Sequence, residues 1–236
     1  MFKKIEPLQH SKHKDLRLSK NVSMAFANDV SSVRLSFSEV RQASRYYPIV
    51  FFENLPCLPH ALLSLQAGTN MFVDDNGNWK TPYVPAHFRL YPFTLARIQE
   101  QEGQFSLCID PDAEHFKSGM GEPLFTADGE LSDFVRNILK SLERYQKEIN
   151  MTKNLLKTLD EQDMITERAF TCRVQEKEKR IDGFMGVDME KLLAMDDSSI
   201  AGYVKSGLMG MVYEHSHSLY NFSYFFSPAP KTEKLN

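Results

Sequence analysis

The sequence predicts an α+β fold with a mainly antiparallel sheet in its N-terminal half. Short apolar segments separated by turn residues occupy residues 48–110, which is typical of strands joined by hairpins. From about residue 130 the apolar residues recur at i, i+3, i+4 and i+7, the spacing of an amphipathic helix. We therefore expect a sheet over about 48–110, packed with a long helix over about 130–159 and with further C-terminal helices.

The composition is that of a globular protein with a sizeable core. The chain has 236 residues, of which 42% are hydrophobic and 11% aromatic, and this length suits one domain. We expect a single domain over residues 1–236, with an irregular N-terminal arm over about 1–20 and a soft boundary near 150–165. The net charge of −3 excludes a general electrostatic attraction to nucleic acid.

The sequence features also predict a cytoplasmic location. The N-terminus lacks the apolar region of a secretory signal, and the three cysteines include no CxxC pair. The longest strongly apolar run, Ile49–Phe52, is too short to cross a membrane. Residues 1–20 hold six basic residues against Glu6 and Asp15. This segment is either a solvated terminus or an arm for peripheral contact with an anionic membrane.

Capping and turn residues predict the first elements. We expect one strand around Val22–Ala27. Ser36 and Glu39 have the spacing of a capping box and should begin a helix that ends before Pro48. Two further short strands are expected, over Ile49–Glu53 and Ala61–Ala67.

An Asn-Gly pair predicts a β-hairpin in the middle of the strand-rich half. Asn76 and Gly77 suit the central positions of a type I′ turn, which both need positive φ. Strands are expected on either side of this turn, over Asn70–Val73 and Trp79–Val84. Two more should follow, over Tyr91–Gln99 and Gln104–Asp110.

The second half of the chain is predicted to be mainly helical. The long helix begins near Glu130 and is expected to break near Asn150. A strand over Ala169–Gln175 is followed by a polar turn at Lys177–Arg180. Three helices complete the chain: Met189–Met195, Ser198–Lys205 with Ser198 as its N-cap, and Leu208–Phe226.

Six strings of residues occur in an order and spacing that resemble one protein family. They are YPIVF at 47–51, NMFVD at 70–74, GNW at 77–79, YVPA at 83–86, RLYPF at 89–93 and VDMEKL at 187–192. Together they make the chain similar to the SapC family over roughly residues 20–226. This resemblance implies a shared fold and a link to the secretion of bacterial surface-layer proteins, and it implies no catalytic residues.

The aromatic residues around the predicted hairpin are the first candidate site. A rigid hairpin can stack a ligand on its rings, and Arg89 can clamp a carboxylate or a phosphate. The alternative is that the rings build the core and Arg89 pairs with an acid. The candidate ligand-binding residues are Trp79, Tyr83, His87, Arg89 and Tyr91.

Two groups of metal-ligating residue types form the second candidate. Cys108, Asp110 and His115 lie near the end of a predicted strand, and Glu214 and His217 have i, i+3 spacing on a predicted helix. The first group matches no established zinc pattern, and the second lacks the second Glu-x-x-His pair of bundle metal sites, so we predict no metal and no other cofactor. The alternatives are an acidic strand end for the first group and a core or partner-facing helix for the second.

The sequence contains no G-x-S-x-G, H-E-x-x-H or phosphate-loop motif. We therefore expect a binding or accessory protein rather than an enzyme, with a peptide, protein or small ligand near the aromatic hairpin. The alternative is a metal-assisted enzyme that acts on a peptide or a carbohydrate.

Overall fold

The computed structural model describes residues 1–19, 22–53, 58–97, 105–174 and 177–226. The chain divides into two compact units. Unit 1 comprises residues 1–28, 73–80 and 86–147, and unit 2 comprises residues 29–72, 81–85 and 148–236. Every strand pair among the described residues is antiparallel, which confirms the α+β prediction. That the whole chain acts as one domain stays a prediction.

Unit 1 is built on a three-stranded sheet of order β1-β7-β6. β6 (Phe93–Arg97) pairs along its length with β7 (Phe105–Ile109), and β1 (Glu6–Pro7) pairs with the other edge of β7. The ends predicted for these strands at Gln99 and Gln104 lie outside the described residues. The remaining elements of unit 1 are short: α1 (His10–His13), β2 (Arg17–Leu18), η1 (Met24–Ala27), α3 (Ala86–Arg89), η2 (Glu114–Phe116) and β8 (Glu122–Pro123).

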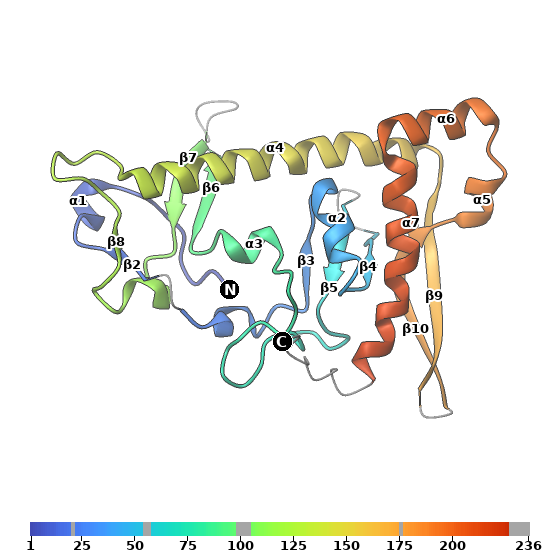
Figure 1. The fold of residues 1–236 in the computed structure, drawn as a ribbon, viewed down its shortest axis with the longest axis horizontal. Helices are drawn as coiled ribbons and strands as arrows, with labels where there is room; N and C mark the ends of the chain where they lie inside the picture. The colour runs from blue at the N-terminus through green and yellow to red at the C-terminus, as the bar shows by residue number, and fades with distance from the viewer. Residues whose placement is uncertain (20–21, 54–57, 98–104, 175–176, 227–236) are drawn as a thin grey trace, which may run out of the picture. The chain divides into compact units, whose positions relative to one another are not determined.

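Helix α4 (Asp133–Glu161) begins in unit 1 and ends in unit 2 (Figure 1). Its buried side chains include Val135, Leu142, Ile149 and Leu156, which are spaced by seven residues. This spacing keeps one stripe of the helix buried along its whole length. The predicted break near Asn150 is therefore wrong, because that residue lies on the exposed side of an uninterrupted helix.

The core of unit 1 combines α4 with the sheet. Phe93 and Ile109 from the sheet belong to the same buried cluster as Val135 and Leu142 from α4. Burial of such side chains contributes about 1.5–3 kcal/mol each. The cluster fixes the sheet to the first half of the helix, and Tyr91 of the candidate site belongs to it as well.

Unit 2 contains a second three-stranded sheet, of order β3-β5-β4. Its strands are β3 (Ser32–Arg34), β4 (Ile49–Val50) and β5 (His60–Leu62). Helix α2 (Phe37–Ala43) begins at the predicted capping box, where the Ser36 N–H donates to Glu39 Oε2 at 2.9 Å. The Phe37 N–H donates to Thr152 Oγ1 of α4 at 2.8 Å, so the start of α2 is held by the long helix.

A long β-ribbon makes up much of the rest of unit 2. β9 (Ile165–Val174) and β10 (Lys177–Val187) pair antiparallel. The polar turn predicted at Lys177–Arg180 is wrong, because these residues form the start of β10. Both faces of the ribbon are exposed there, so charged residues occupy strand positions without an alternating apolar pattern.

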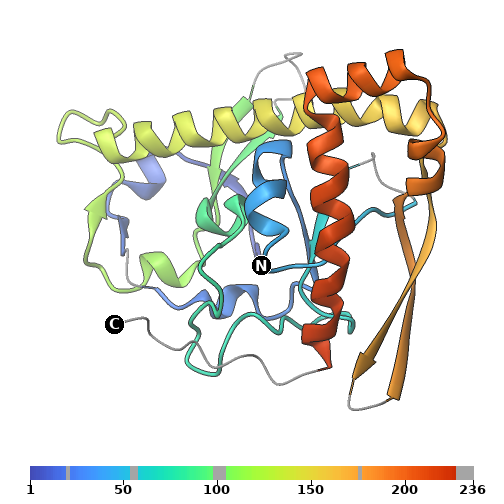
Figure 2. The same cartoon turned by 45° about the vertical axis from the view of Figure 1, so that its right-hand side comes forward.

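Helices follow the ribbon in unit 2, and α7 lies alongside it in Figures 1 and 2. They are α5 (Met189–Leu193), α6 (Asp197–Ser206), α7 (Leu208–Ser218) and η3 (Leu219–Phe225). The N-cap of α6 is Asp196 rather than the predicted Ser198, because Asp196 Oδ1 accepts the Ser199 N–H at 3.0 Å. Gly207, with a φ of 81°, ends α6.

The Asn76-Gly77 turn does not form the predicted hairpin strands. Val73 and Trp79 make one isolated antiparallel bridge, and no strand flanks it among the described residues. Gly77 has a φ of 75° but Asn76 is not in the positive region, whereas a type I′ turn needs both. Instead Asp74 Oδ1 accepts the N–H groups of Asn76 and Asn78 at 2.9 and 2.7 Å and closes a compact loop.

The strand predicted around Val22–Ala27 is also wrong. Within that segment Met24–Ala27 form the 3₁₀ helix η1, whose N-cap Ser23 accepts the Ala25 N–H at 3.1 Å. The Met24 N–H donates to the Gly77 carbonyl oxygen at 2.7 Å. This contact anchors the compact loop that carries Trp79 to η1.

Candidate functional site

Four of the five predicted ligand-binding residues lie in unit 1. Trp79 follows the compact loop, His87 and Arg89 lie on α3, and Tyr91 comes just before β6. Tyr83 belongs to unit 2, where its hydroxyl donates to Glu39 Oε1 at 2.8 Å. We therefore describe the unit 1 residues as one site and Tyr83 by itself.

The short helix α3 places a buried aromatic ring, Phe88, beneath the site. Ala86 and Phe88 are buried, whereas His87 is half-buried and Arg89 is exposed. The ring of Trp79 packs against Phe88 with 5.0 Å between centroids, and the His87 ring lies 6.0 Å from the same Phe88 ring. The half-exposed rings of Trp79 and His87 thus both lie close to one buried ring, and the next residue in the chain, Arg89, is exposed.

Tyr91 lies at the centre of a cluster of rings inside unit 1. Phe26 stacks on it at 4.3 Å and 22°, and Phe2 and His115 meet it edge-on at 5.0 and 5.2 Å. Phe2 also lies 6.3 Å from the His87 ring. The cluster therefore continues from the buried Tyr91 to the half-exposed His87. Phe2 and Phe26 carry no sequence signal for this role, because they are far from residue 91 in the chain.

A buried carboxylate holds Tyr91 in place. Asp110 is fully buried, and its Oδ2 accepts the Tyr91 hydroxyl at 3.1 Å and the Lys3 N–H at 2.8 Å. The Asp112 N–H donates to Oδ1 at 3.2 Å. Burial, and then the negative charge of Asp110, raise the pKa of Tyr91. The hydroxyl therefore stays protonated and donates, and the N-terminal segment is fixed to the end of β7.

The first group of metal-ligating residues lies in the same unit. Cys108 is buried on β7, and its burial raises the pKa of the thiol. Burial lowers the pKa of His115, whose Nδ1 is buried without a hydrogen-bond partner. Among the residues that the structure describes, no three His, Cys, Asp or Glu side chains are grouped so as to hold a metal ion. That the chain holds no metal ion stays a prediction.

The second group lies on α7 in unit 2. Glu214 Oε2 accepts the Ser44 hydroxyl at 2.6 Å, and His217 is exposed. The residue between them, His215, is buried and was not predicted as important. Its ring bridges the backbone of Ile49 and Val187, so its contacts are structural.

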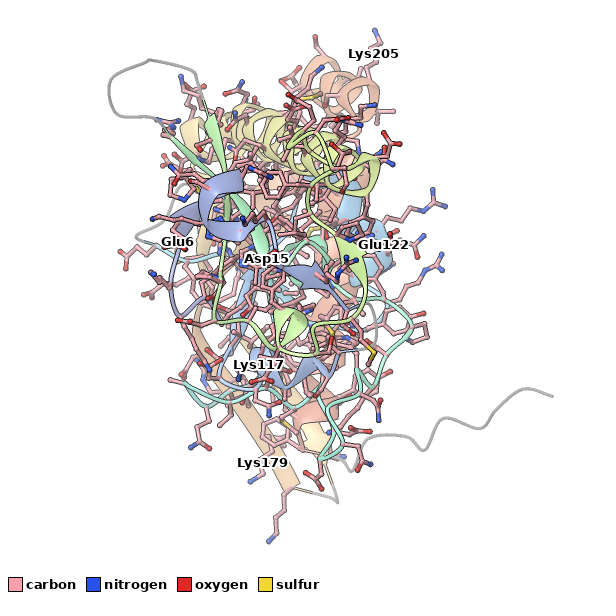
Figure 3. The ribbon with its side chains drawn as sticks, turned by 90° about the vertical axis from the view of Figure 1, so that its left-hand side faces the viewer. Glu6, Asp15, Lys117, Glu122, Lys179 and Lys205 are labelled. Carbon is pink, nitrogen blue, oxygen red and sulfur yellow. The ribbon has the colours of Figure 1, made fainter. Side chains whose placement is uncertain are left out.

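The basic N-terminal segment is tied into unit 1 and carries acids among its bases. Lys4 Nζ lies 2.9 Å from Glu6 Oε2, and the buried His13 ring lies 2.8 Å from Glu6 Oε1. These hydrogen bonds, that of Lys4 first, lower the pKa of Glu6 to about 2. Figure 3 shows Glu6 on the same side of unit 1 as Asp15 and Glu122. In the described part of the chain, no helix is long and apolar enough to span a membrane.

Comparison with known proteins supports the resemblance stated above. The family model described as SapC matches residues 8–224. No curated protein and no solved structure matches the chain. The match extends over far more than half of the 236 residues and takes in both units, including the whole candidate site apart from Phe2 and Lys3. The chain therefore belongs to the SapC family.

Proposed function

We propose that this SapC family protein is a non-enzymatic binding protein that holds an acidic peptide segment of a protein partner. The segment binds at the face formed by Trp79, His87 and Arg89, which we call the Phe88 face because both rings pack on Phe88. The observation that carries the proposal is the packing of the half-exposed Trp79 ring against that buried ring, at 5.0 Å.

Rigidity supports a binding role for this face. The compact loop before Trp79 is closed by Asp74 and anchored to η1 through Gly77. A Cβ atom added to Gly77 would lie 1.7 Å from Ser23 Oγ, so the loop packs closely on η1. A preformed aromatic surface loses little conformational entropy when a ligand stacks on it, and Trp and Arg are enriched where binding energy concentrates.

The chemistry of Arg89 supports an acidic ligand. Arg89 is an exposed residue, and a guanidinium group has the planar geometry that binds a carboxylate through two parallel hydrogen bonds. The rings of Trp79 and His87, which pack on Phe88, offer stacking to an aromatic or proline side chain of the same ligand. A short peptide that combines a carboxylate with a ring therefore matches this face. The secretion link implied by the family suggests a partner destined for the cell surface.

Two carboxylates of the candidate metal groups already accept hydrogen bonds within the protein. Asp110 accepts three hydrogen bonds from its own unit, and Glu214 accepts one from Ser44.

Calorimetric titration of the full chain tests the proposal. The probes are acetylated peptides that place Asp or Glu beside Phe or Tyr, and matched peptides with Asn or Gln in place of the acids. We expect the acidic peptides to bind, and Arg89→Ala to weaken binding roughly tenfold or more. Arg41→Ala is the matched control, because Arg41 is an exposed arginine on α2 of unit 2. Equal binding of the amide peptides, or binding unchanged by Arg89→Ala, would contradict the proposal.

A further inference from the structure

Strand β9 has an open edge. It is ten residues long, which corresponds to roughly 30 Å of extended chain. Its pairing partner is β10, and no other described strand is hydrogen-bonded to it. The far edge of β10 is partly occupied, because Phe51 and Met185 exchange two backbone hydrogen bonds of 2.9 Å. Figure 1 shows β9 on the side of the ribbon away from α7. The outer edge of β9 therefore has no strand partner among the described residues, and its backbone donors and acceptors are of the kind that pair with another strand.

One side chain of β9, Phe170, packs against the core of unit 2. Phe170 stacks on the buried Phe222 at 5.6 Å and meets Tyr220 edge-on at 5.7 Å. The irregularity of the ribbon places two residues of β10, Asp182 and Gly183, opposite the single residue Ala169. The bulge is therefore on β10, and β9 stays regular. Natural edge strands are often protected by proline or by a bulge of their own, and β9 has neither.

The charges on the exposed face of β9 are arranged symmetrically about Phe170. Glu167 lies three residues before it and Arg173 three residues after it. Both side chains are exposed, and the residues between them on that face, Ala169 and Thr171, are small. A two-fold axis at Phe170 would set each Glu167 opposite Arg173 of a second copy. Opposite charges directly across an antiparallel pair are favourable, and like charges there are unfavourable.

We propose that β9 is a dimerisation edge, through which two copies of this chain pair antiparallel about a two-fold axis at Phe170. The two ribbons then form one continuous four-stranded sheet. The interface is formed by the same patch on both copies, as two-fold symmetry requires. This inference does not depend on the Phe88 face, which lies in unit 1.

Of this register and its two neighbours, only the axis at Phe170 sets each Glu167 opposite Arg173 of the other copy. Moving the axis to Ala169 sets Glu167 opposite Thr171, and moving it to Thr171 sets Arg173 opposite Ala169. Within one chain Glu167 lies opposite the uncharged Met185, and Arg173 lies opposite Glu178 at 3.7 Å. In the dimer, Arg173 therefore lies between Glu178 of its own ribbon and Glu167 of the second copy.

An exposed ring lies beside the proposed axis. Tyr220 is 71% exposed and packs against Phe170, the residue on the axis. Pairing through β9 brings the two Phe170 side chains opposite each other, and aromatic pairs across strands are stabilising. The proposed interface, which we call the seam, therefore has an aromatic pair at its centre and a charge pair on each side.

Sedimentation equilibrium of the full chain over a range of concentrations tests the dimer. The wild type should dimerise reversibly. Glu167→Arg sets two Arg–Arg pairs across the seam and should raise the dimer dissociation constant roughly tenfold or more. Arg173→Glu should do the same through two Glu–Glu pairs. The double variant Glu167→Arg/Arg173→Glu restores both pairs with exchanged signs and should return the dissociation constant close to that of the wild type.

The control is Asp182→Arg, an equally exposed charge reversal on β10 away from the open edge, which should leave dimerisation unchanged. Hydrogen exchange should show protection of residues 165–174 that grows with protein concentration. A monomer at every concentration, as would be found if the edge serves a strand of another protein, would overturn the inference. So would a dimer that tolerates either single reversal, or one that the double variant does not restore.

Discussion

His215 Nδ1 lies 2.8 Å from the carbonyl oxygen of Ile49. The other ring nitrogen, Nε2, accepts the Val187 N–H at 3.1 Å. One nitrogen donates and the other accepts, so only the neutral imidazole satisfies both contacts. The ring thereby joins α7 to both β4 and β10 inside unit 2. Complete burial, opposed by the hydrogen bond to Ile49 and helped by the charge of Arg168, lowers the pKa of His215 from its ordinary value of 6.5 to about 4.

The pKa of His215 predicts that unit 2 loses stability in mild acid. The folded pKa of about 4 lies below the unfolded value of 6.5, so the unfolded chain binds the proton first. The contribution of neutral His215 to the free energy of unfolding is complete above pH 6.5. It is lost as the pH falls toward 4, and the loss is at most about 3 kcal/mol. Urea unfolding followed by far-UV circular dichroism across this range measures it.

The control for this prediction is on the same helix. His217 is exposed, so His217→Ala should leave the pH dependence unchanged. His215→Phe should reduce the slope between pH 6.5 and 4, because the group that titrates is removed. A slope that survives in His215→Phe would show that other groups produce it.

Two glycine substitutions should have opposite effects on stability. A Cβ at Gly186 would lie 3.1 Å from His215 Nε2 and 3.0 Å from Arg168 Cγ, so Gly186→Ala should destabilise by about 1–3 kcal/mol. At Gly202, inside α6, the added Cβ would meet no atom within 4 Å apart from its chain neighbours and the backbone of its own helix. Gly202→Ala should stabilise by about 0.5–1 kcal/mol. Thermal unfolding compares both with the wild type, and a shift of the same sign for both variants would contradict the packing described around His215.

The hydrogen bonds of Asp110 should matter for the stability of unit 1. Tyr91→Phe removes one donor and should cost about 1–2 kcal/mol, whereas Asp110→Ala leaves three donors without their acceptor and should cost about 2–4 kcal/mol. The emission of Trp79, the single tryptophan, follows unfolding of unit 1 in urea. Asp112→Ala is the control, because only its backbone N–H contacts Asp110. Equal costs for Asp110→Ala and Asp112→Ala would exclude this network.

The two described cysteines should differ in reactivity. Cys108 is 2% exposed, and burial raises the pKa of its thiol, so little reactive thiolate forms. Cys172 is half-exposed on β9 and should be alkylated first by iodoacetamide in the native protein. Peptide mass mapping resolves the sites, including Cys57, which lies outside the described residues. Faster labelling of Cys108 than of Cys172 would show that unit 1 opens more readily than this structure implies.

The sequence predicted the elements whose signals are local. The capping box at Ser36 and the apolar spacing of α4 each lie within one element, and both are confirmed. The apolar residues from Val135 to Leu156 recur every seven positions, so the same pattern also favours an uninterrupted helix. Asn150 was misleading because asparagine is a poor helix former, yet one exposed residue does not end a helix whose other face stays buried.

Other features depend on contacts that leave no local signal. The first residues of β10 have no alternation of apolar and polar side chains, because both faces of the ribbon are exposed there. The packing of Phe2 and Phe26 on Tyr91 joins segments far apart in the chain. The predicted site included Trp79, His87 and Arg89. The role of Phe88 as the buried ring against which Trp79 packs could be assigned only from the structure.

The emission of Trp79 tests the central claim most directly, because it is the single tryptophan of the chain and lies on the Phe88 face. An acidic aromatic peptide bound there should shift this emission and protect it from quenching by acrylamide, at the same concentrations at which calorimetry detects binding. Arg89→Ala should weaken both changes, and Arg41→Ala should leave them intact. Calorimetric binding of the peptide with no change at Trp79 would contradict the account, because the peptide would then bind elsewhere.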